Sequence, residues 1–489
     1  MMTPLKTDEL QFSSLDEHPH EECGVVAIYA PNEDVSKMAF YALFALQHRG
    51  QEAAGIAVSD GSTIRIHKDL GLVSQVFTPT TLAPLSGSFA IGHNRYSTTG
   101  SSTARNAQPF LLETRYGPIA VAHNGNLVNS AELRQKLLEN GVGLVSSSDT
   151  ELIAQTLAGA SGANTFERLK NAMLCWQGAY SLVVLTIDEV FVARDPWGFR
   201  PLSVGMLPSG GHAAASESGA LNSLGCLGIR EVKPGEIIAL SNTALRVEQA
   251  IPTAEPTALC TFETIYFSRQ DNIWDGRSVH QMRYNLGKAL AEEASVDADV
   301  VIPVPDSSIP AAMGFSQTTG IPYEDGFIKN RYIGRTFIEP TDALRKQGVA
   351  LKYSVIYEKV RDQRVVVIDD SLVRGNTIAP LIQLLRDAGA KEVHLRITCP
   401  PIPYPCFMGV DMGTHGDLIA NSHSVEEIRA QIGADSLIFL TLEKMMAAIG
   451  RSEGYCNACF TGCYPLPVPS GMVKTGFETC IEDIRVMGR

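Results

Sequence analysis

The chain has 489 residues, of which 45% are hydrophobic and 19% charged, an ordinary composition for a globular protein of two or more domains. Its formal net charge of -13 argues against a nucleic-acid partner held by bulk electrostatics. It contains no apolar run of about 18 residues, the length that a membrane span needs. Ten cysteines are too few for a disulfide framework in so long a chain, so we expect metal binding or catalysis from them.

Residues 1–22 are polar and acidic and lack the apolar core of a signal peptide. They end at Glu21 and Glu22, directly before Cys23. A frayed terminus would explain this composition, but a propeptide is the sharper interpretation. Its removal would give Cys23 a free α-amino group, whose pKa of about 7.7–8.0 suits a general base at neutral pH. The alternative is that Cys23 is a small buried hydrophobe in a strand.

Short apolar runs broken by Gly, Ser and Asn follow, and they predict strands. Helices are expected at 35–48, 131–140 and 149–159. This half should form a two-sheet sandwich with helical cover, and linker-like residues at 245–260 should end it. The predicted strands are Val25–Tyr29, Gly55–Val58, Phe89–Gly92, Ile119–His123, Leu182–Ile187 and Val190–Ala193.

Four residues in this half, together with Cys23, predict a binding site for glutamine. Asn124 and Gly125 offer an amide and a backbone N–H as an oxyanion hole, Arg95 offers a planar fork for a carboxylate, and Asp149 offers a carboxylate for an ammonium group. Each has a plainer alternative: a hairpin turn for Asn124-Gly125, a helix N-cap for Asp149, and a surface ion pair for Arg95.

These motifs, with Gln47–Glu52 and Arg194–Gly198, resemble those of the N-terminal-nucleophile glutamine amidotransferases. The resemblance runs from residue 23 to about residue 240. It implies an α+β hydrolase sandwich of the αββα type over residues 23–250, in which Cys23 attacks glutamine. By itself it leaves the acceptor of the ammonia open.

In the second half, the sequence pattern changes to alternating strands, loops and helices. The apolar runs Val300–Val304 and Arg364–Ile368 are typical of buried parallel strands. After the second run, apolar residues at helical spacing lead from Ile378 to Ala388, and the strand Val393–Thr398 follows. This βαβ unit predicts an α/β domain with a parallel sheet over residues 260–489.

The loop inside that unit indicates a phosphorylated sugar. Asp369 and Asp370 stand where vicinal ribose hydroxyls could be bound, and the next residues can turn backbone N–H groups onto a phosphate. A plain strand-to-helix turn is the alternative. The run resembles the phosphoribosylpyrophosphate loop of type I phosphoribosyltransferases. The resemblance implies that residues 329–352 form a basic lid and that Ser307, Asp369 and Asp370 bind Mg²⁺. It also implies that the phosphoribosylpyrophosphate is bound by Lys329, Asp369, Asp370, Ser371, Arg374, Gly375, Asn376 and Thr377.

Cys456 and Cys459 form a Cys-x₂-Cys pair near the C-terminus. Four thiolates would suit Zn²⁺ or a [4Fe–4S] cluster equally well, and spacing does not separate them. Some members of the family that this chain resembles carry such a cluster. In those members, the positions of the other two ligands correspond to Cys260 and Cys406. Cys463 departs from the family pattern, which usually has Lys there, and is expected to be a spare thiol.

The two halves together resemble bifunctional amidotransferases that open purine biosynthesis by making 5-phosphoribosylamine. This implies glutamine and phosphoribosylpyrophosphate as substrates, feedback by purine nucleotides, a homotetramer, and a cytoplasmic location without nucleic-acid or membrane partners. Two alternatives stay open. One is a glutaminase joined to a sugar-phosphate isomerase, and the other is an iron–sulfur sensor in which Cys23 is never exposed as the first residue.

Overall fold

The computed structural model describes residues 23–96, 103–240, 245–330, 352–451 and 453–469. They divide into two compact units. The sandwich unit holds described residues up to Met282 together with 404–413 and those from Ile449 onward, and the parallel-sheet unit holds 283–403 and 414–448. The predicted propeptide, and residues 331–351 of the predicted lid, lie outside the described residues. The domain limits inferred from sequence, 23–250 and 260–489, stay predictions.

Two antiparallel sheets form the sandwich, one with the strand order β11-β9-β10-β1-β4-β2-β3 and one with the order β13-β12-β8-β7-β6-β5. The strands are β1 (Gly24–Tyr29), β2 (Ala53–Ser59), β3 (Ile64–Leu70), β4 (Phe89–Arg95), β5 (Phe110–Thr114), β6 (Gly117–Leu127), β7 (Gly178–Leu185), β8 (Val190–Arg194), β9 (Ser203–Met206), β10 (His212–Ala215), β11 (Leu227–Glu231), β12 (Glu236–Leu240) and β13 (Arg246–Gln249).

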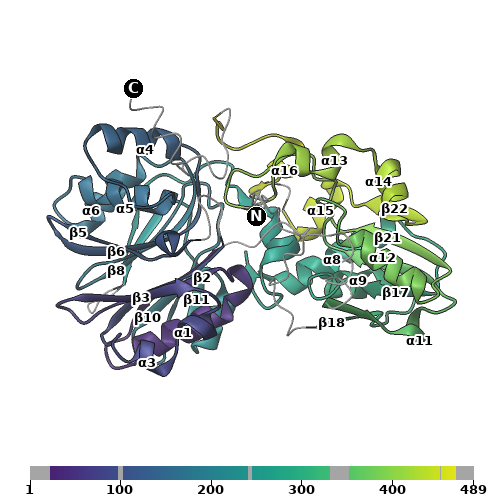
Figure 1. Cartoon of the computed structure of the whole chain (residues 1–489), viewed down its shortest axis with the longest axis horizontal. Helices are drawn as coiled ribbons and strands as arrows, with labels where there is room; N and C mark the ends of the chain where they lie inside the picture. Colours follow the sequence, from purple (N-terminus) through teal and green to yellow (C-terminus); the bar gives the residue numbers. More distant parts are fainter. Residues whose placement is uncertain (1–22, 97–102, 241–244, 331–351, 452, 470–489) are drawn as a thin grey trace, which may run out of the picture. The chain divides into compact units, whose positions relative to one another are not determined.

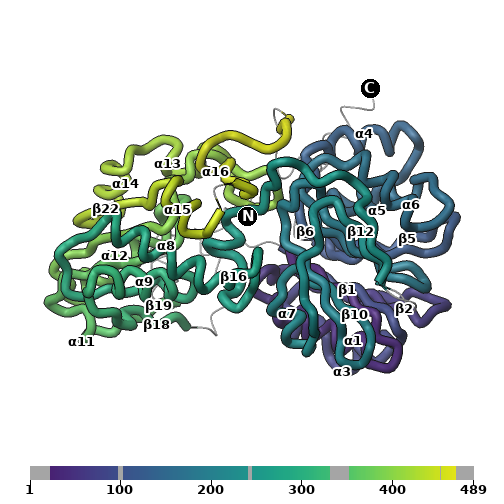
Figure 2. Tube along the Cα trace, turned by 180° about the vertical axis from the view of Figure 1, so that it is seen from behind, coloured from purple at the N-terminus to yellow at the C-terminus, as the bar shows by residue number. Residues whose placement is uncertain are grey.

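The side chains of β1 point alternately to the two faces of its sheet and so contribute to two different cores. Val25 and Ala27 face a core shared by both sheets, whereas Val26 and Ile28 face a second core under α1. A third core lies between the other sheet and α5 and α6, and Figure 1 shows these helices on the side opposite α1. The αββα prediction is therefore confirmed. The helices are α1 (Val35–Ala45), α2 (Val73–Val76), α3 (Pro79–Leu82), α4 (Ser130–Glu139), α5 (Asp149–Gly159), α6 (Thr165–Met173) and α7 (Ser218–Ser223), and α7 packs beside α1, as Figure 2 shows from behind.

The C-terminal segment returns to the sandwich unit through a short parallel pair. Strand β14 (Leu259–Cys260) pairs with β23 (Tyr455–Cys456), which sets Cys260 opposite Cys456. The π-helix η3 (Glu263–Phe267) follows β14, and α16 (Ala458–Thr461) follows β23. The remaining elements of this region are η1 (Gln47–Arg49), η2 (Ala104–Asn106), β15 (Ile273–Trp274) and β16 (Arg277–Ser278).

The parallel-sheet unit contains four parallel strands in the order β17-β20-β21-β22. Residues 365–368 in the middle of strand β20 are apolar and buried, as the sequence predicted for a parallel strand. The strands are β17 (Val300–Pro303), β20 (Arg364–Asp369), β21 (Glu392–Ile397) and β22 (Ser436–Phe439), with the small antiparallel pair β18 (Phe327–Lys329) and β19 (Tyr353–Val355). The helices are α8 (Val279–Glu293), α9 (Ile309–Thr319), α11 (Tyr357–Val360), α12 (Ile378–Asp387), η4 (His415–Asp417), α13 (Ile419–Ser422), α14 (Val425–Ile432) and α15 (Leu442–Ile449). Throughout the described ranges, every helix is too short or too polar to cross a membrane.

Candidate functional site

Cys23 stands at the start of β1, where the register pairs the next residue, Gly24, with Asn94 of β4. Its side chain is buried, with 6% of the residue exposed. The Sγ donates to the carbonyl oxygen of Tyr96 at 3.1 Å, and the Tyr96 N–H donates back to Sγ at 3.4 Å. The backbone of the neighbouring strand end therefore fixes the thiol. Sequence reasoning missed Tyr96, because a backbone contact leaves no side-chain signal.

Burial raises the pKa of the Cys23 thiol to about 11, against the lowering effects of the Tyr96 backbone and the Arg95 charge. The charges of Glu52 and Asp149 raise this pKa further. The thiol is therefore protonated at neutral pH, and a nucleophile at this place needs a base within reach. Since both Arg95 and Asp149 act on the charge of Cys23, these two predicted site residues lie near the sulfur.

Asn124 and Gly125 lie inside β6, paired with Ser181 and Tyr180 of β7. The hairpin-turn alternative is therefore wrong. The Nδ2 of Asn124 is buried and has no hydrogen-bond partner among the described residues, although burying an unpaired donor costs about 1–3 kcal/mol. A Cβ on Gly125 would come within 2.0 Å of a backbone oxygen, and its φ is +148°. Only glycine fits there, and Asn124 keeps a donor available for an incoming oxygen.

Arg95 and Asp149 are both buried, with 2% and 4% exposed. The surface ion pair suggested for Arg95 is therefore wrong; its Nη1 lies 3.8 Å from Oε2 of Glu52. Asp149 opens α5, but the N-cap of that helix is Ser148. The Oδ2 of Asp149 accepts from the Leu127 N–H at 3.0 Å, which ties α5 to the end of the strand that holds Asn124.

The Arg194–Gly198 motif supports the fold near this site. Asp195 accepts from the backbone N–H groups of Trp197 and Gly198 at 2.9 and 2.7 Å through Oδ1, and from Tyr180 at 3.1 Å through Oδ2. Burial raises the pKa of Asp195 to about 6. Since Tyr180 pairs with Gly125, this carboxylate holds the strand beside the candidate oxyanion hole.

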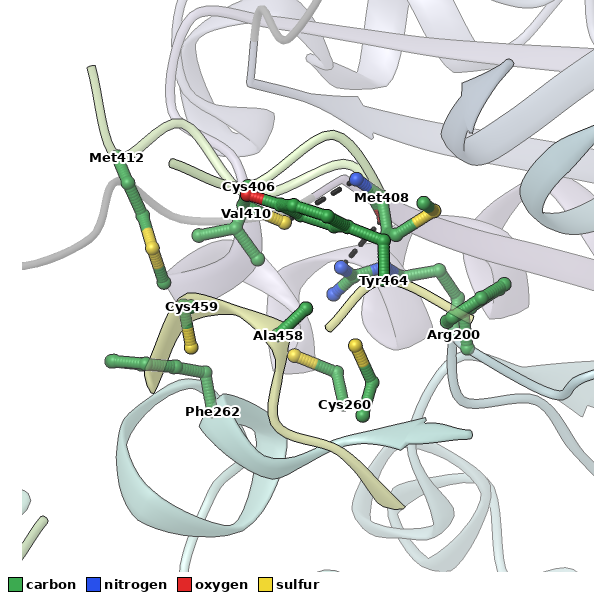
Figure 3. A pocket seen from close by; sticks show the side chains of 12 residues that line it. Arg200, Cys260, Phe262, Cys406, Met408, Val410, Met412, Ala458, Cys459 and Tyr464 are labelled. Atoms are coloured by element: carbon green, nitrogen blue, oxygen red, sulfur yellow. Dashed lines mark hydrogen bonds between the residues drawn. The ribbon is translucent and has the colours of Figure 1, made fainter. Parts of the chain in front are cut away.

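Cys260, Cys406, Cys456 and Cys459, the four residues expected to be ligands, line one pocket of the sandwich unit (Figure 3). The rest of the lining is Phe199, Arg200, Phe262, Met408, Val410, Met412, Ala458 and Tyr464. The Met408 N–H donates to the Cys406 Sγ at 3.3 Å. Burial raises the pKa of Cys260 to about 11, and it raises that of Cys456 still more. Cys463 is exposed and is not part of this lining.

In the parallel-sheet unit, Asp369 ends β20 and Asp370 follows it, both buried. The Ser307 hydroxyl donates to Oδ2 of Asp370 at 2.6 Å, and the Ser308 hydroxyl donates to Oδ1 of Asp369 at 3.3 Å. The structure therefore brings together the three residues expected to serve Mg²⁺, which come from the ends of adjacent parallel strands.

The loop from Ser371 to Thr377 connects β20 to α12, as predicted. Gly375 has φ +80°, which favours glycine. Arg374 and Thr377 are half-buried, and Asn376 is exposed. The Ser371 hydroxyl donates to Oδ1 of Asp370 at 2.6 Å, so here its proton serves the acidic pair and does not point to a phosphate. Lys329 ends β18, with Nζ 3.4 Å from Oδ2 of Asp306.

Two family models match the chain, a glutamine amidotransferase domain over residues 93–223 and a phosphoribosyl transferase domain over residues 278–401. The amidophosphoribosyltransferase of Synechococcus elongatus is 49% identical over 465 residues, which cover 94% of this chain and 94% of that protein. That of Bacillus subtilis is 47% identical, with 92% of this chain and 95% of the relative covered. A solved glutamine phosphoribosylpyrophosphate amidotransferase from B. subtilis, complexed with ADP and GMP, matches with a TM-score of 0.87 at 46% identity, covering 92% of this chain and 99% of that one. The transferase match does not support the isomerase alternative.

Proposed function

This chain belongs to the amidophosphoribosyltransferase family, and from that membership we propose that Cys23 is the nucleophile of its glutaminase half. The enzyme catalyses the first step of purine biosynthesis. Glutamine supplies ammonia, which displaces pyrophosphate from phosphoribosylpyrophosphate to give 5-phosphoribosylamine. Each half of this reaction has a candidate site in the described residues.

In the glutaminase half, removal of residues 1–22 frees the α-amino group of Cys23, which takes the thiol proton. The sulfur attacks the side-chain amide carbon of glutamine, and Asn124 and Gly125 stabilise the oxyanion. The carbon–nitrogen bond breaks as the amine returns its proton to the leaving nitrogen, releasing ammonia and leaving a thioester. Water hydrolyses the thioester to glutamate and restores the thiol. Arg95 and Asp149 hold the amino-acid end of the substrate.

In the transferase half, the lone pair of ammonia attacks C1 of the sugar as the bond to pyrophosphate breaks and a proton leaves the nitrogen. Asp369 and Asp370 accept from the ribose hydroxyls, and the loop from Ser371 to Thr377 binds the 5-phosphate. Two buried carboxylates and a serine hydroxyl fit Mg²⁺, which is usually held by one or two carboxylates plus substrate phosphates. When bound by Ser307, Asp369 and Asp370, Mg²⁺ would neutralise charge on the pyrophosphate.

The observation that carries the glutaminase assignment is a strand-end thiol in a site where Asn124 keeps a buried donor that has no partner among the described residues. An electrophilic analogue of glutamine, with the reactive carbon in place of the side-chain amide, should therefore label Cys23. Mass spectrometry of the digested protein identifies the labelled thiol and shows whether Cys23 is the first residue. The exposed thiols of Cys175 and Cys463 are internal controls, since they react with simple alkylating agents but lack the glutamine site. Labelling of those thiols with Cys23 unlabelled would refute the assignment.

The four thiols around one pocket are proposed to hold a [4Fe–4S] cluster with a structural role. The four sulfurs share one cavity, and the Met408 N–H donates to the sulfur of Cys406. Hydrogen bonds to the sulfurs are among the features that tune a cluster. The resemblance to family members that carry a cluster favours iron over Zn²⁺. Iron and acid-labile sulfide, about four of each per chain, should be lost in Cys459→Ser and retained in Cys463→Ser; a zinc content of one per chain would contradict the cluster.

The remaining assignments follow from family membership. A relative of known structure was solved with ADP and GMP, which supports purine nucleotides as feedback inhibitors of this enzyme. We also propose a homotetramer acting in the cytoplasm. Light scattering of the purified protein would measure the oligomeric state, and titration of the coupled activity with AMP and GMP would measure the inhibition.

A further inference from the structure

Three fully buried charged side chains form a cluster that contacts the backbone of Cys23. The Nε of Arg49 donates to the carbonyl oxygen of Cys23 at 3.2 Å. Its Nη1 donates to Oε1 of Glu217 at 2.7 Å, and its Nη2 donates to Oε1 of Glu263 at 2.7 Å. The side chains of all three charged residues are 0% exposed. Arg49 therefore fixes the backbone of the nucleophile, and two carboxylates fix Arg49.

Glu263 continues this group toward the cysteine pocket. It lies on η3, three positions after Cys260, and its Oε1 is 3.5 Å from Nη1 of Arg200. Arg200 donates from Nε and Nη2 to the carbonyl oxygen of Met408 at 2.8 and 2.7 Å, and Figure 3 shows this contact in the pocket wall. Because the Met408 N–H binds the sulfur of Cys406, continuous contacts join the pocket to Cys23.

The same segment touches the candidate oxyanion strand. The Nδ2 of Asn126 donates to the carbonyl oxygen of Phe407 at 2.9 Å. A Cβ on Gly409 would lie 3.0 Å from the backbone carbon of Gly125, so Gly409 packs directly on that residue. Residues 406–409 therefore contact both the support of the nucleophile and the strand that carries the oxyanion donors.

We propose that the Cys406–Gly409 segment positions the glutaminase centre, with Arg49, Glu263 and Arg200 as positioning residues for Cys23, and Asn126 for the donors of Asn124 and Gly125. The inference rests on the proposed role of Cys23. Buried charges are costly to retain and can be replaced by apolar groups of similar volume without loss of stability, so fixing the geometry of a reacting group is a reason to keep them. A displacement of about 1 Å is enough to lower a rate about a hundredfold. Disturbing the segment should therefore slow glutamine use and leave the transfer of added ammonia intact.

The test is Glu263→Gln in the full-length protein, with Glu236→Gln as the matched control. Glu236 is a buried carboxylate of the same unit, and it pairs with Arg230 outside this set of contacts. We expect Glu263→Gln to lower the kcat for glutamine about tenfold to a hundredfold with little change in KM, and to slow alkylation of Cys23 by iodoacetamide to a similar extent. Ammonia-dependent phosphoribosylamine formation and iron content should stay within about twofold of the control.

A second variant, Asn126→Ala, tests the other contact and decides the matter if Glu263→Gln does not fold. Its control is Asn129→Ala, which also removes a hydrogen bond from a side-chain amide to a backbone carbonyl oxygen, in this case that of Cys175. The kcat for glutamine should fall selectively in Asn126→Ala. Equal glutamine kcat and alkylation rates in variant and control would overturn the positioning role, provided that the unaltered enzyme hydrolyses glutamine. Failure of the unaltered enzyme to do so would instead overturn the proposed function of Cys23.

Discussion

The Sγ of Cys23 and the backbone of Tyr96 are held together by hydrogen bonds in both directions, at 3.1 Å to the carbonyl oxygen and 3.4 Å from the N–H. Both bonds use main-chain atoms of the residue directly after β4. The position of the thiol is therefore set by the pairing of β1 with β4 and is independent of the side chain at position 96.

Cys23→Ser should abolish glutamine-dependent synthesis, by about 10⁴-fold or more, because the thiolate is the attacking group. Synthesis from added ammonium salt should survive, since the transferase site does not use the thiol. Cys226→Ser is a matched control, because Cys226 is also a buried cysteine of the sandwich unit. Both activities are measured by phosphoribosylamine formation. Loss of both in correctly processed Cys23→Ser, with the control active, would contradict the two-site account.

The reactivity of Cys23 should depend on pH differently before and after removal of residues 1–22. In a chain that retains them, burial holds the pKa of the Cys23 thiol at about 11. The reactive thiolate should then increase about tenfold per pH unit up to that value. In a chain that begins at Cys23, the amine serves as the base, and alkylation should level off near its pKa of about 7.7–8.0. Identical alkylation profiles for the two chains would argue against the amine as the base.

Asn124→Ala should lower the glutaminase kcat by about 10²–10³-fold, the cost of removing one oxyanion donor. The melting temperature should not fall through loss of a hydrogen bond, because the Nδ2 of Asn124 has no hydrogen-bond partner in the described part of the chain. Steady-state kinetics and thermal unfolding together measure both effects. A large loss of stability with an unchanged kcat would mean that the residue only supports the fold.

Asp370→Asn should lower the rate of sugar transfer about a hundredfold, whether glutamine or added ammonia supplies the nitrogen. Basal glutamine hydrolysis should persist. The change removes the charge expected to serve the ribose and Mg²⁺, and it alters the contacts from Ser307 and Ser371. Asp299→Asn is the control, because Asp299 pairs with Arg364 in the same unit and lies at the opposite end of β20. Intact phosphoribosylamine formation in Asp370→Asn would show that the ribose assignment is wrong.

Elements with strong apolar signals could be predicted from the sequence. The expected helix 149–159 coincides with α5, and the predicted βαβ unit corresponds to β20, α12 and β21. The strands that sequence reasoning missed include the sheet edges β3, β11, β5 and β13. Strand β13 is exposed along its whole length, and β3 is partly or fully exposed throughout. Edge strands like these lack a deeply buried face, so their sequences carry little hydrophobic alternation.

The four cysteines expected as ligands line one pocket, while their role and those of the other expected site residues stay predictions. Contacts between residues distant in sequence could not be predicted. Glu263 reaches Arg49 across 214 positions, and no local pattern marks it. Asn124-Gly125 reads as a turn in isolation, yet its place in β6 depends on pairing with β7. Roles that depend on long-range packing become visible only in the folded chain.

The coupling of glutamine hydrolysis to sugar transfer is tested most directly by following glutamate and pyrophosphate in one reaction of purified protein with glutamine, phosphoribosylpyrophosphate and Mg²⁺. Omitting each substrate in turn shows whether the two sites are coupled. Both products should form together in a ratio near one, and mainly when both substrates are present. Glutamate release at an undiminished rate without the sugar, and no pyrophosphate with it, would contradict the bifunctional account.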